Sequence, residues 1–506
     1  MNLIPEKAGK TPNYWCTWHT QNFSGITEPL ESMSPALFEG DQGAKSARSR
    51  LNQEALFGEC GWADFFPEIR RDLYLMLDDG WDVPYGVHPD ENLGKFGSLE
   101  LSEDRFPSFS GTPAGRLQKL NSRVQEKGWK GIGLWIAAQE ADESIPQKEY
   151  WKQRMEWCRD AGISYWKVDW GRHAHDLSFR RMLTELASET YPDLLIEHAY
   201  NCGPVNGFRV SEKGSIETGR FEQWEDYAEK SLALREFSQV FRSYDVTAQL
   251  GTASTVDRLS VLLGHNLQGL VNCEDEPYLA AGLGCANGIM RSPKLLEIPG
   301  LDYDPHHIRH KLLESIRAVR WQRIAPAFAG TPLHVSGTIL TDSWHFRPGE
   351  TWMSACIGRT IRQSAPAALS RNMPLPLVSG QKDLPFVVCS KTPDHVVSAA
   401  ILPRTFDHEE GVCPDTSVEL CFDCLPRMVG LFGNCFSWRL RFPKRSSSLQ
   451  VWAQDIARQT PQNISAGVRW EENTCVIPGS LIRQLCLTDD KEDLSSPGAA
   501  VYFSEP

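Results

Sequence analysis

The sequence predicts an α/β fold, namely a (β/α)8 TIM barrel followed by a C-terminal antiparallel β-sandwich domain. Over residues 13–332, short apolar or aromatic runs alternate with longer amphipathic stretches, as in repeated βα units. After about residue 344 the runs become short, alternate with period two and are separated by Pro, Gly, Asn and Asp, which is typical of a sandwich. The length of 506 residues also exceeds that of one ordinary domain. We therefore expect a barrel over residues 1–344 and a sandwich over residues 345–506.

Eight short runs are candidates for the barrel strands. Each is rich in apolar or aromatic residues, as expected of parallel strands that are buried on both faces. They cover residues 14–18, 73–77, 131–137, 165–169, 194–198, 239–242 and 269–271, with an eighth near Ile289. Two stretches between them carry apolar residues at helical spacing and end near glycine, as crossover helices do. These stretches are residues 117–128 and 150–162.

Composition excludes several classes of function. The formal net charge of -13 disfavours nucleic acid as a partner, because phosphate binding requires clustered Lys and Arg. No apolar run approaches the ~20 residues that cross a bilayer, so no membrane partner is expected. The start of the chain lacks the basic and apolar regions of a signal peptide, so a cytoplasmic location is the default expectation, or a secreted or periplasmic one if a leader was removed. The 14 Cys are widely scattered, which indicates free thiols, and no metal or other cofactor is expected.

Two aspartate motifs each follow an apolar run. They read LDDGW at residues 77–81 and YWKVDWG at residues 165–171. Residues two apart in a strand point the same way, so Lys167 and Asp169 are expected on one face, with Val168 and Trp170 on the other. A cation beside a carboxylate favours the ionised form, which suits Asp169 to attack an anomeric carbon from the carboxyl end of a strand. The alternative is a salt bridge that only stabilises the barrel mouth.

Cleavage of a glycosidic bond requires a second carboxyl group, which protonates the leaving oxygen. Asp245 fits this role, because it follows the predicted strand at residues 239–242 and so lies at a carboxyl end. The competing acids are Glu197 and the Glu-Asp-Glu run at residues 274–276, and the latter run reads more readily as surface acids. Asp78 and Asp79 are adjacent and point to opposite faces, so they serve either as acceptors for vicinal sugar hydroxyls or as a helix cap.

The order of these motifs resembles the melibiase-type α-galactosidase clan, glycoside hydrolase families twenty-seven and thirty-six. The resemblance covers roughly residues 12–345 and rests on DDGW, GIGLWI, KVD and FRSYD in that order. In this clan the paired aspartates and the Lys of K-x-D bind hydroxyl groups of galactose, and the Asp of K-x-D is the nucleophile. The resemblance therefore implies substrate binding by Asp78, Asp79 and Lys167, and a nucleophilic role for Asp169.

The same resemblance implies further site residues. Asp245, preceded by Arg242, corresponds to the acid/base of the clan, and Trp135 and Trp18 correspond to aromatic residues that line the sugar site. The fifth predicted strand reads EHAYNCGP, where the clan has a Cys- and Gly-containing motif that reads the 2-position of the sugar. Glu197, Cys202 and Arg242 are also expected to contact substrate.

The predicted activity is that of a retaining exo-glycoside hydrolase acting on terminal α-D-galactosides through a covalent glycosyl-enzyme. The nearest alternatives are a β-L-arabinopyranosidase and an α-N-acetylgalactosaminidase with the same site, since loss of one substituent contact changes transition-state binding only modestly. A galactosyl transferase would use the same residues. From a different class, a non-catalytic carbohydrate-binding barrel is possible, because fold does not fix function.

Overall fold

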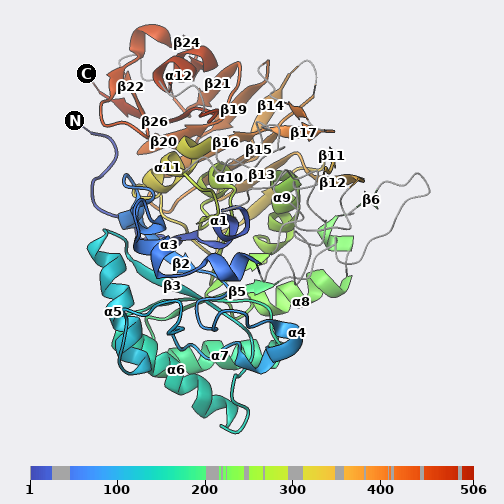
Figure 1. The fold of residues 1–506 in the computed structure, drawn as a ribbon. Coiled ribbons are helices and arrows are strands. Elements are labelled where there is room, and N and C mark those ends of the chain that lie inside the picture. Colours follow the sequence, from blue (N-terminus) through green and yellow to red (C-terminus); the bar gives the residue numbers. More distant parts are fainter. Residues whose placement is uncertain are drawn as a thin grey trace.

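The computed structural model describes most of the chain and confirms the predicted fold class. The described residues are 2–24, 46–200, 216–217, 220–223, 225–243, 250–265, 268–293, 311–347, 358–380, 383–407, 409–411, 415–444, 449–487 and 493–505. In Figure 1 barrel strands such as β2, β3 and β5 and the helices α5 to α8 occupy the lower half, and the strands of the C-terminal half lie above them, next to α10 and α11. Among the described residues, no helix is long and apolar enough to cross a membrane.

The barrel is an eight-stranded parallel sheet in the order β8-β7-β5-β4-β3-β2-β1-β9. Its strands are β1 (Asn13–Cys16), β2 (Leu73–Leu77), β3 (Gly131–Ile136), β4 (Tyr165–Val168), β5 (Leu195–Tyr200), β7 (Val240–Ser243), β8 (Leu270–Val271) and β9 (Gly288–Ile289). β1 pairs with β9, and a parallel bridge between Asn272 and Ala286 joins the segments beside β8 and β9. This bridge closes the sheet into a barrel. Every strand lies at or within a few residues of its predicted position.

Helices lie between the barrel strands along the chain and in the segment that follows the last strand. They are α1 (Trp18–Phe23), α3 (Gln53–Phe57), α4 (Pro89–Asn92), α5 (Pro113–Glu126), α6 (Gln147–Ala161), α7 (Leu177–Thr190), α8 (Glu225–Arg235), α9 (Gly251–Leu262), α10 (Pro277–Leu283) and α11 (Leu312–Trp321). The two predicted crossover helices are confirmed as α5 and α6. Thr112 accepts a hydrogen bond from Gly115 N at the start of α5, and Gly162 ends α6 in a left-handed conformation with φ of 69°.

Successive side chains along β1, β2 and β4 alternate between two buried clusters, one outside the barrel sheet and one inside it. Trp15, Leu75 and Trp166 face outward into the core beneath the helices. Their neighbours Tyr14, Cys16, Met76 and Tyr165 form a separate buried cluster inside the barrel. Because side chains of a strand alternate between its faces, this pattern directs Lys167, two residues after Tyr165, toward the barrel interior.

The C-terminal half forms two packed sheets, as predicted for a sandwich. One has the order β10-β13-β15-β16-β20-β26-β22-β23, and the other has the order β14-β19-β21-β25-β24. The first comprises β10 (Leu333–Val335), β13 (Ala368–Arg371), β15 (Phe386–Lys391), β16 (Val396–Leu402), β20 (Met428–Phe432), β22 (Gln450–Asp455), β23 (Gln462–Asn463) and β26 (Gly498–Ser504). The second comprises β14 (Leu377–Ser379), β19 (Ser417–Cys421), β21 (Ser437–Arg441), β24 (Arg469–Glu471) and β25 (Thr474–Pro478), with α12 (Gly479–Leu485) following. Apolar side chains of both sheets share one core.

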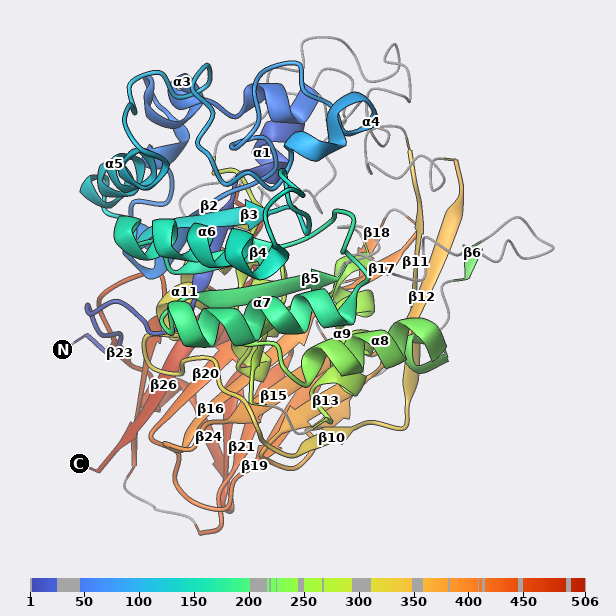
Figure 2. The same cartoon turned by 90° about the horizontal axis from the view of Figure 1, so that it is seen from below.

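Antiparallel pairs predominate in the sandwich, but three pairs are parallel. They are β13 with β15, β16 with β20, and β19 with β21. A smaller sheet, β18-β17-β11-β12-β6, lies beside the sandwich. It contains β6 (Ile216–Glu217), β11 (Ile339–His345), β12 (Thr360–Pro366), β17 (Arg404–Phe406) and β18 (Glu409–Gly411). In Figure 2, β11 and β12 run side by side on the right of the view, next to α9 of the barrel half.

Two helices of the barrel half also form part of the sandwich interface. Apolar residues of α10 and α11 share a core with the larger sandwich sheet. A Cβ atom at Gly282 of α10 would lie 2.7 Å from Val388 Cγ2, so only glycine permits this close approach. Trp321 of α11 donates a hydrogen bond of 2.8 Å to Ser398 Oγ on β16. The barrel and the sandwich are therefore joined by shared packing.

Candidate active site

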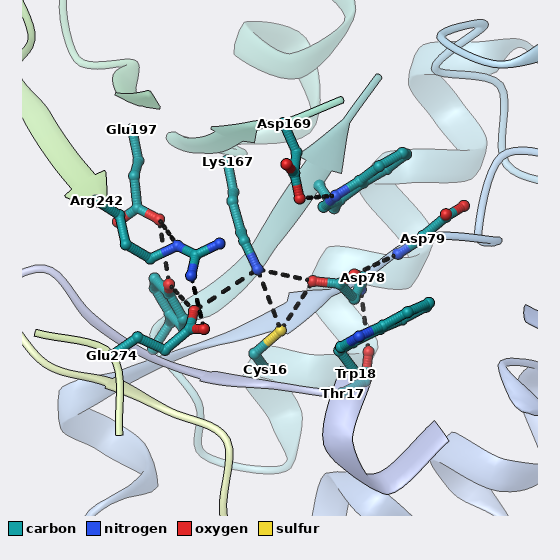
Figure 3. A network of polar contacts seen from close by, with 12 residues as sticks. Cys16, Thr17, Trp18, Asp78, Asp79, Lys167, Asp169, Glu197, Arg242 and Glu274 are labelled. Carbon is teal, nitrogen blue, oxygen red and sulfur yellow. Dashed lines mark hydrogen bonds and ion pairs between the residues drawn. The ribbon is translucent and has the colours of Figure 1, made fainter. Parts of the chain in front are cut away.

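Charged side chains from adjacent barrel strands converge at the carboxyl end of the barrel. In the strand register Lys167 of β4 lies beside Trp135 of β3 and Glu197 of β5, and Asp169 follows the last residue of β4. Figure 3 shows Lys167 and Asp169 projecting side by side from the same region of β4. The carboxyl end of a parallel barrel is where enzymes of this fold keep their reacting groups.

Asp169 is held from both its side chain and its backbone. The Trp135 indole Nε1 donates a hydrogen bond of 3.0 Å to Asp169 Oδ2. Arg180 of α7 donates from NH2 to the Asp169 carbonyl at 2.8 Å and from NH1 to the Val168 carbonyl at 3.0 Å. The side chain of Asp169 is buried. A carboxylate fixed in this way keeps its direction, as a nucleophile requires.

Lys167 and Asp78 form a buried ion pair beside Asp169. The Lys167 ammonium lies 3.0 Å from Asp78 Oδ2 and 3.8 Å from Cys16 Sγ, and the Cys16 thiol donates to Asp78 Oδ2 at 2.9 Å (Figure 3). Burial opposes the charged form, but Asp78, Cys16 and Glu274 outweigh it and raise the pKa of Lys167 well above its usual value. The Lys167 ammonium, which the sequence predicts on the same face as Asp169, thus binds the carboxylate of Asp78. Lys167, Asp78 and Cys16 form one polar cluster.

Asp79 points away from Asp78, as adjacency in a strand predicts, and binds Arg48. The Arg48 guanidinium contacts Asp79 Oδ2 at 2.6 Å, and the Trp170 indole donates to the same oxygen at 3.3 Å. Burial raises the pKa of Asp79, although Arg48 opposes this shift. The sequence predicts that Trp170 shares the outward face of Val168. This prediction is wrong, because β4 ends at Val168 and the chain turns, so that Trp170 packs against Trp135 at a centroid distance of 5.3 Å.

A third acid on this segment, Asp82, gives a test by pH. Burial raises the pKa of Asp82 to about 7, from an ordinary 3.8, and Asp79 adds to this shift. The folded state therefore binds more protons than the unfolded state between about pH 4 and pH 7, and stability falls as pH rises through this window. We therefore expect the difference in free energy of unfolding, Asp82→Asn minus wild type, to increase from pH 4.5 to pH 7.5. Urea unfolding at each pH measures this difference. A constant difference across this range would contradict the assignment.

Glu197 and Arg242 lie in the barrel interior. The Glu197 carboxylate accepts hydrogen bonds from Tyr14 at 3.1 Å, Tyr165 at 2.8 Å and Asn272 at 2.7 Å, and its Oε1 lies 3.7 Å from Arg242 Nε. Burial raises the pKa of Glu197, and Arg242 opposes the shift. The side chain is fully buried. These contacts favour a structural role for Glu197 over the substrate contact that the sequence predicts.

The other predicted site residues divide into two groups. Trp18 is the first residue of α1 and packs, partly buried, against the interior cluster that contains Cys16. Asp245 and Cys202 lie outside the described residues. Within the described parts of the chain, no three His, Cys, Asp or Glu side chains are grouped so that they could hold a metal ion.

Sequence reasoning missed several residues of this cluster. Cys16 has a recognisable signal, because alternation from Tyr14 along β1 places both side chains inside the barrel. Glu274 is read from the sequence as a surface acid, but Arg242 NH1 donates to its Oε1 at 2.7 Å. Arg48 comes from a segment before β2 that has no strand pattern, so no local signal identifies it as the partner of Asp79.

Comparisons with known proteins find similarity in fold only. No protein-family model matches the chain, and no curated protein sequence matches it. Among solved structures, α-galactosidase I from Mortierella vinacea is 11% identical with a TM-score of 0.37, covering 98% of this chain and 97% of that chain. A family 27 β-L-arabinopyranosidase from Geobacillus stearothermophilus, in complex with arabinose, is 10% identical with a TM-score of 0.38 and 98% coverage of both chains. An α-galactosidase from Saccharomyces cerevisiae with raffinose is 8% identical with a TM-score of 0.35, covering 98% and 94%.

Proposed function

We propose that this protein is a retaining exo-glycoside hydrolase that releases terminal α-D-galactosyl residues. The main support is the arrangement at the barrel mouth, where Asp169, fixed by Trp135, stands beside the Asp78–Lys167 ion pair. An acceptor and a cationic donor next to a fixed carboxylate suit a sugar whose adjacent hydroxyl groups bind the pair while its anomeric carbon faces the carboxylate.

In the proposed reaction Asp169 attacks the anomeric carbon, while Asp245 protonates the departing glycosidic oxygen. This step forms a covalent glycosyl-enzyme through an oxocarbenium-like transition state. Asp245 then takes a proton from water, the water oxygen bonds to the anomeric carbon, and the bond to Asp169 breaks. Two inversions retain the α configuration. Asp78 and Lys167 are proposed to bind sugar hydroxyls throughout, together with Asp79 and the indoles of Trp18 and Trp135.

A panel of p-nitrophenyl glycosides tests the proposal. We expect release of p-nitrophenol from the α-D-galactopyranoside by the wild-type protein. The β-L-arabinopyranoside and the α-N-acetylgalactosaminide serve as comparators, because they differ from galactose only in a hydroxymethyl or a 2-substituent. Faster turnover of either comparator would reassign the substrate. Binding of galactose without turnover of any member would instead favour a carbohydrate-binding protein.

Trp135 provides a more specific test of the site. Trp135→Phe keeps an aromatic ring but removes the N–H that contacts Asp169 at 3.0 Å. A hydrogen bond to a charged group contributes about 1.5–3 kcal/mol, so kcat is expected to fall roughly 10- to 100-fold. Initial rates with the best substrate of the panel measure this, and Trp157→Phe, on the helical layer, is the matched control. Equal rates for the two variants would remove Trp135 from the proposed machinery.

A further inference from the structure

Glu274 bridges two cationic side chains of the barrel interior, Lys167 and Arg242. It follows β8, where the barrel closes, and its side chain is only 11% exposed. Its Oε1 accepts from Arg242 NH1 at 2.7 Å, whereas its Oε2 accepts from the Tyr14 hydroxyl at 3.0 Å and lies 3.7 Å from Lys167 Nζ. Figure 3 shows this carboxylate between the Lys167 and Arg242 side chains. The reading of Glu274 as a surface acid is therefore wrong.

The charges around Glu274 alternate in sign across the barrel. The sequence of contacts runs from Asp78 through Lys167, Glu274 and Arg242 to Glu197. Lys167 is thus held between a carboxylate from the β2 side and one from the β8 side. Without the Glu274 charge, Lys167 and Arg242 would be two neighbouring cations in a buried space, and Lys167 would keep its ion pair with Asp78 but lose the carboxylate on its other side.

From this geometry we propose that Glu274 is a positioning residue for sugar binding. It holds the Lys167 ammonium beside Asp78, in the position from which both groups would bind the substrate hydroxyls. It also anchors Arg242 of β7, the strand that leads to Asp245. The inference rests on the proposed function. It adds Glu274, which lies at the barrel seam, where the segments beside β8 and β9 meet, and which acts through Lys167.

Glu274→Gln tests this role, because the amide has the same shape but lacks the charge. We expect KM for the galactoside and the inhibition constant of D-galactose to rise together by roughly 10-fold or more, as for the loss of a charged contact. Glu274→Asp, which keeps the charge on a shorter side chain, is expected to recover part of the loss. KM and the inhibition constant do not depend on how much of the protein is active, so they separate positioning from a fold defect.

The matched control is Glu276→Gln, two residues along the same segment. Glu276 lies on the same segment but accepts a hydrogen bond of 2.8 Å from Thr252 Oγ1, at the start of α9. Its KM is expected to equal that of wild type. The inference would be overturned if Glu274→Gln changed kcat alone, or behaved like Glu276→Gln. Folded wild-type protein without turnover of any glycoside would overturn the proposed function, and this role with it.

Discussion

The Asp169→Asn variant is expected to lose turnover by on the order of 10⁴-fold or more, while still binding galactose. The amide keeps the shape of the side chain and can still meet the Trp135 indole, but it cannot form the bond to the anomeric carbon. Initial rates of p-nitrophenol release measure the loss. Asp160→Asn, at the exposed end of α6, is the control for a general effect of losing a carboxylate.

Azide distinguishes a nucleophile from a group that only orients the substrate. In Asp169→Ala the truncated side chain leaves room for a small anion, which should attack the anomeric carbon and give a galactosyl azide of β configuration. Appearance of that product with recovered rate identifies the attacking group. Retention of more than about one tenth of the wild-type rate by Asp169→Asn would disprove the nucleophilic role and redirect the search to another carboxylate.

The second large effect is on stability. Arg317 of α11 forms a bidentate ion pair with Asp455 of β22, with Nε to Oδ1 at 2.8 Å and NH2 to Oδ2 at 3.1 Å. Both side chains are at most 3% exposed. Removing Arg317 leaves the buried Asp455 carboxylate with only the half-exposed Arg458, at 3.7 Å, as a cationic partner, so Arg317→Ala is expected to lower the free energy of unfolding by about 3–5 kcal/mol. Equilibrium unfolding in urea measures the difference.

Two comparisons control this prediction. Arg123 and Glu126 form an exposed pair on α5, and Arg123→Ala is expected to change stability by less than about 1 kcal/mol. The double variant Arg317→Met with Asp455→Leu should recover much of the loss, because apolar groups of similar volume leave no charge without a partner. If Arg317→Ala lowered the free energy of unfolding by no more than Arg123→Ala does, the ion pair between Arg317 and Asp455 would not stabilise the contact between α11 and the sandwich.

The sequence predicts the barrel well because parallel strands leave a strong local pattern. The strand predicted at residues 73–77 agrees with β2, since its apolar run is bounded by charge on both sides. The weaker eighth strand near Ile289 also exists, although it is only two residues long. Parallel pairing in the sandwich could not be predicted, because alternation within a strand does not specify its neighbour.

The candidate site is predictable only where strand geometry determines it. Lys167 and Asp169 share a face because they are two residues apart, and Asp78 approaches them because it directly follows β2, the strand two positions away in the barrel. The partners Arg48 and Glu274 come from segments without a regular pattern. Their placement depends on how the chain returns to the barrel, which no local sequence signal determines.

The packing of α10 links the barrel half to the sandwich. This helix begins at Pro277, directly after the acids at residues 274–276, and its residues share a core with β15, β16 and β20. An apolar helix face that loses its sheet becomes exposed to water, and its burial is what makes the helix stable. The sandwich therefore acts as a folding partner of the barrel seam. It cannot be exchanged as an independent module without disturbing the last strands of the barrel.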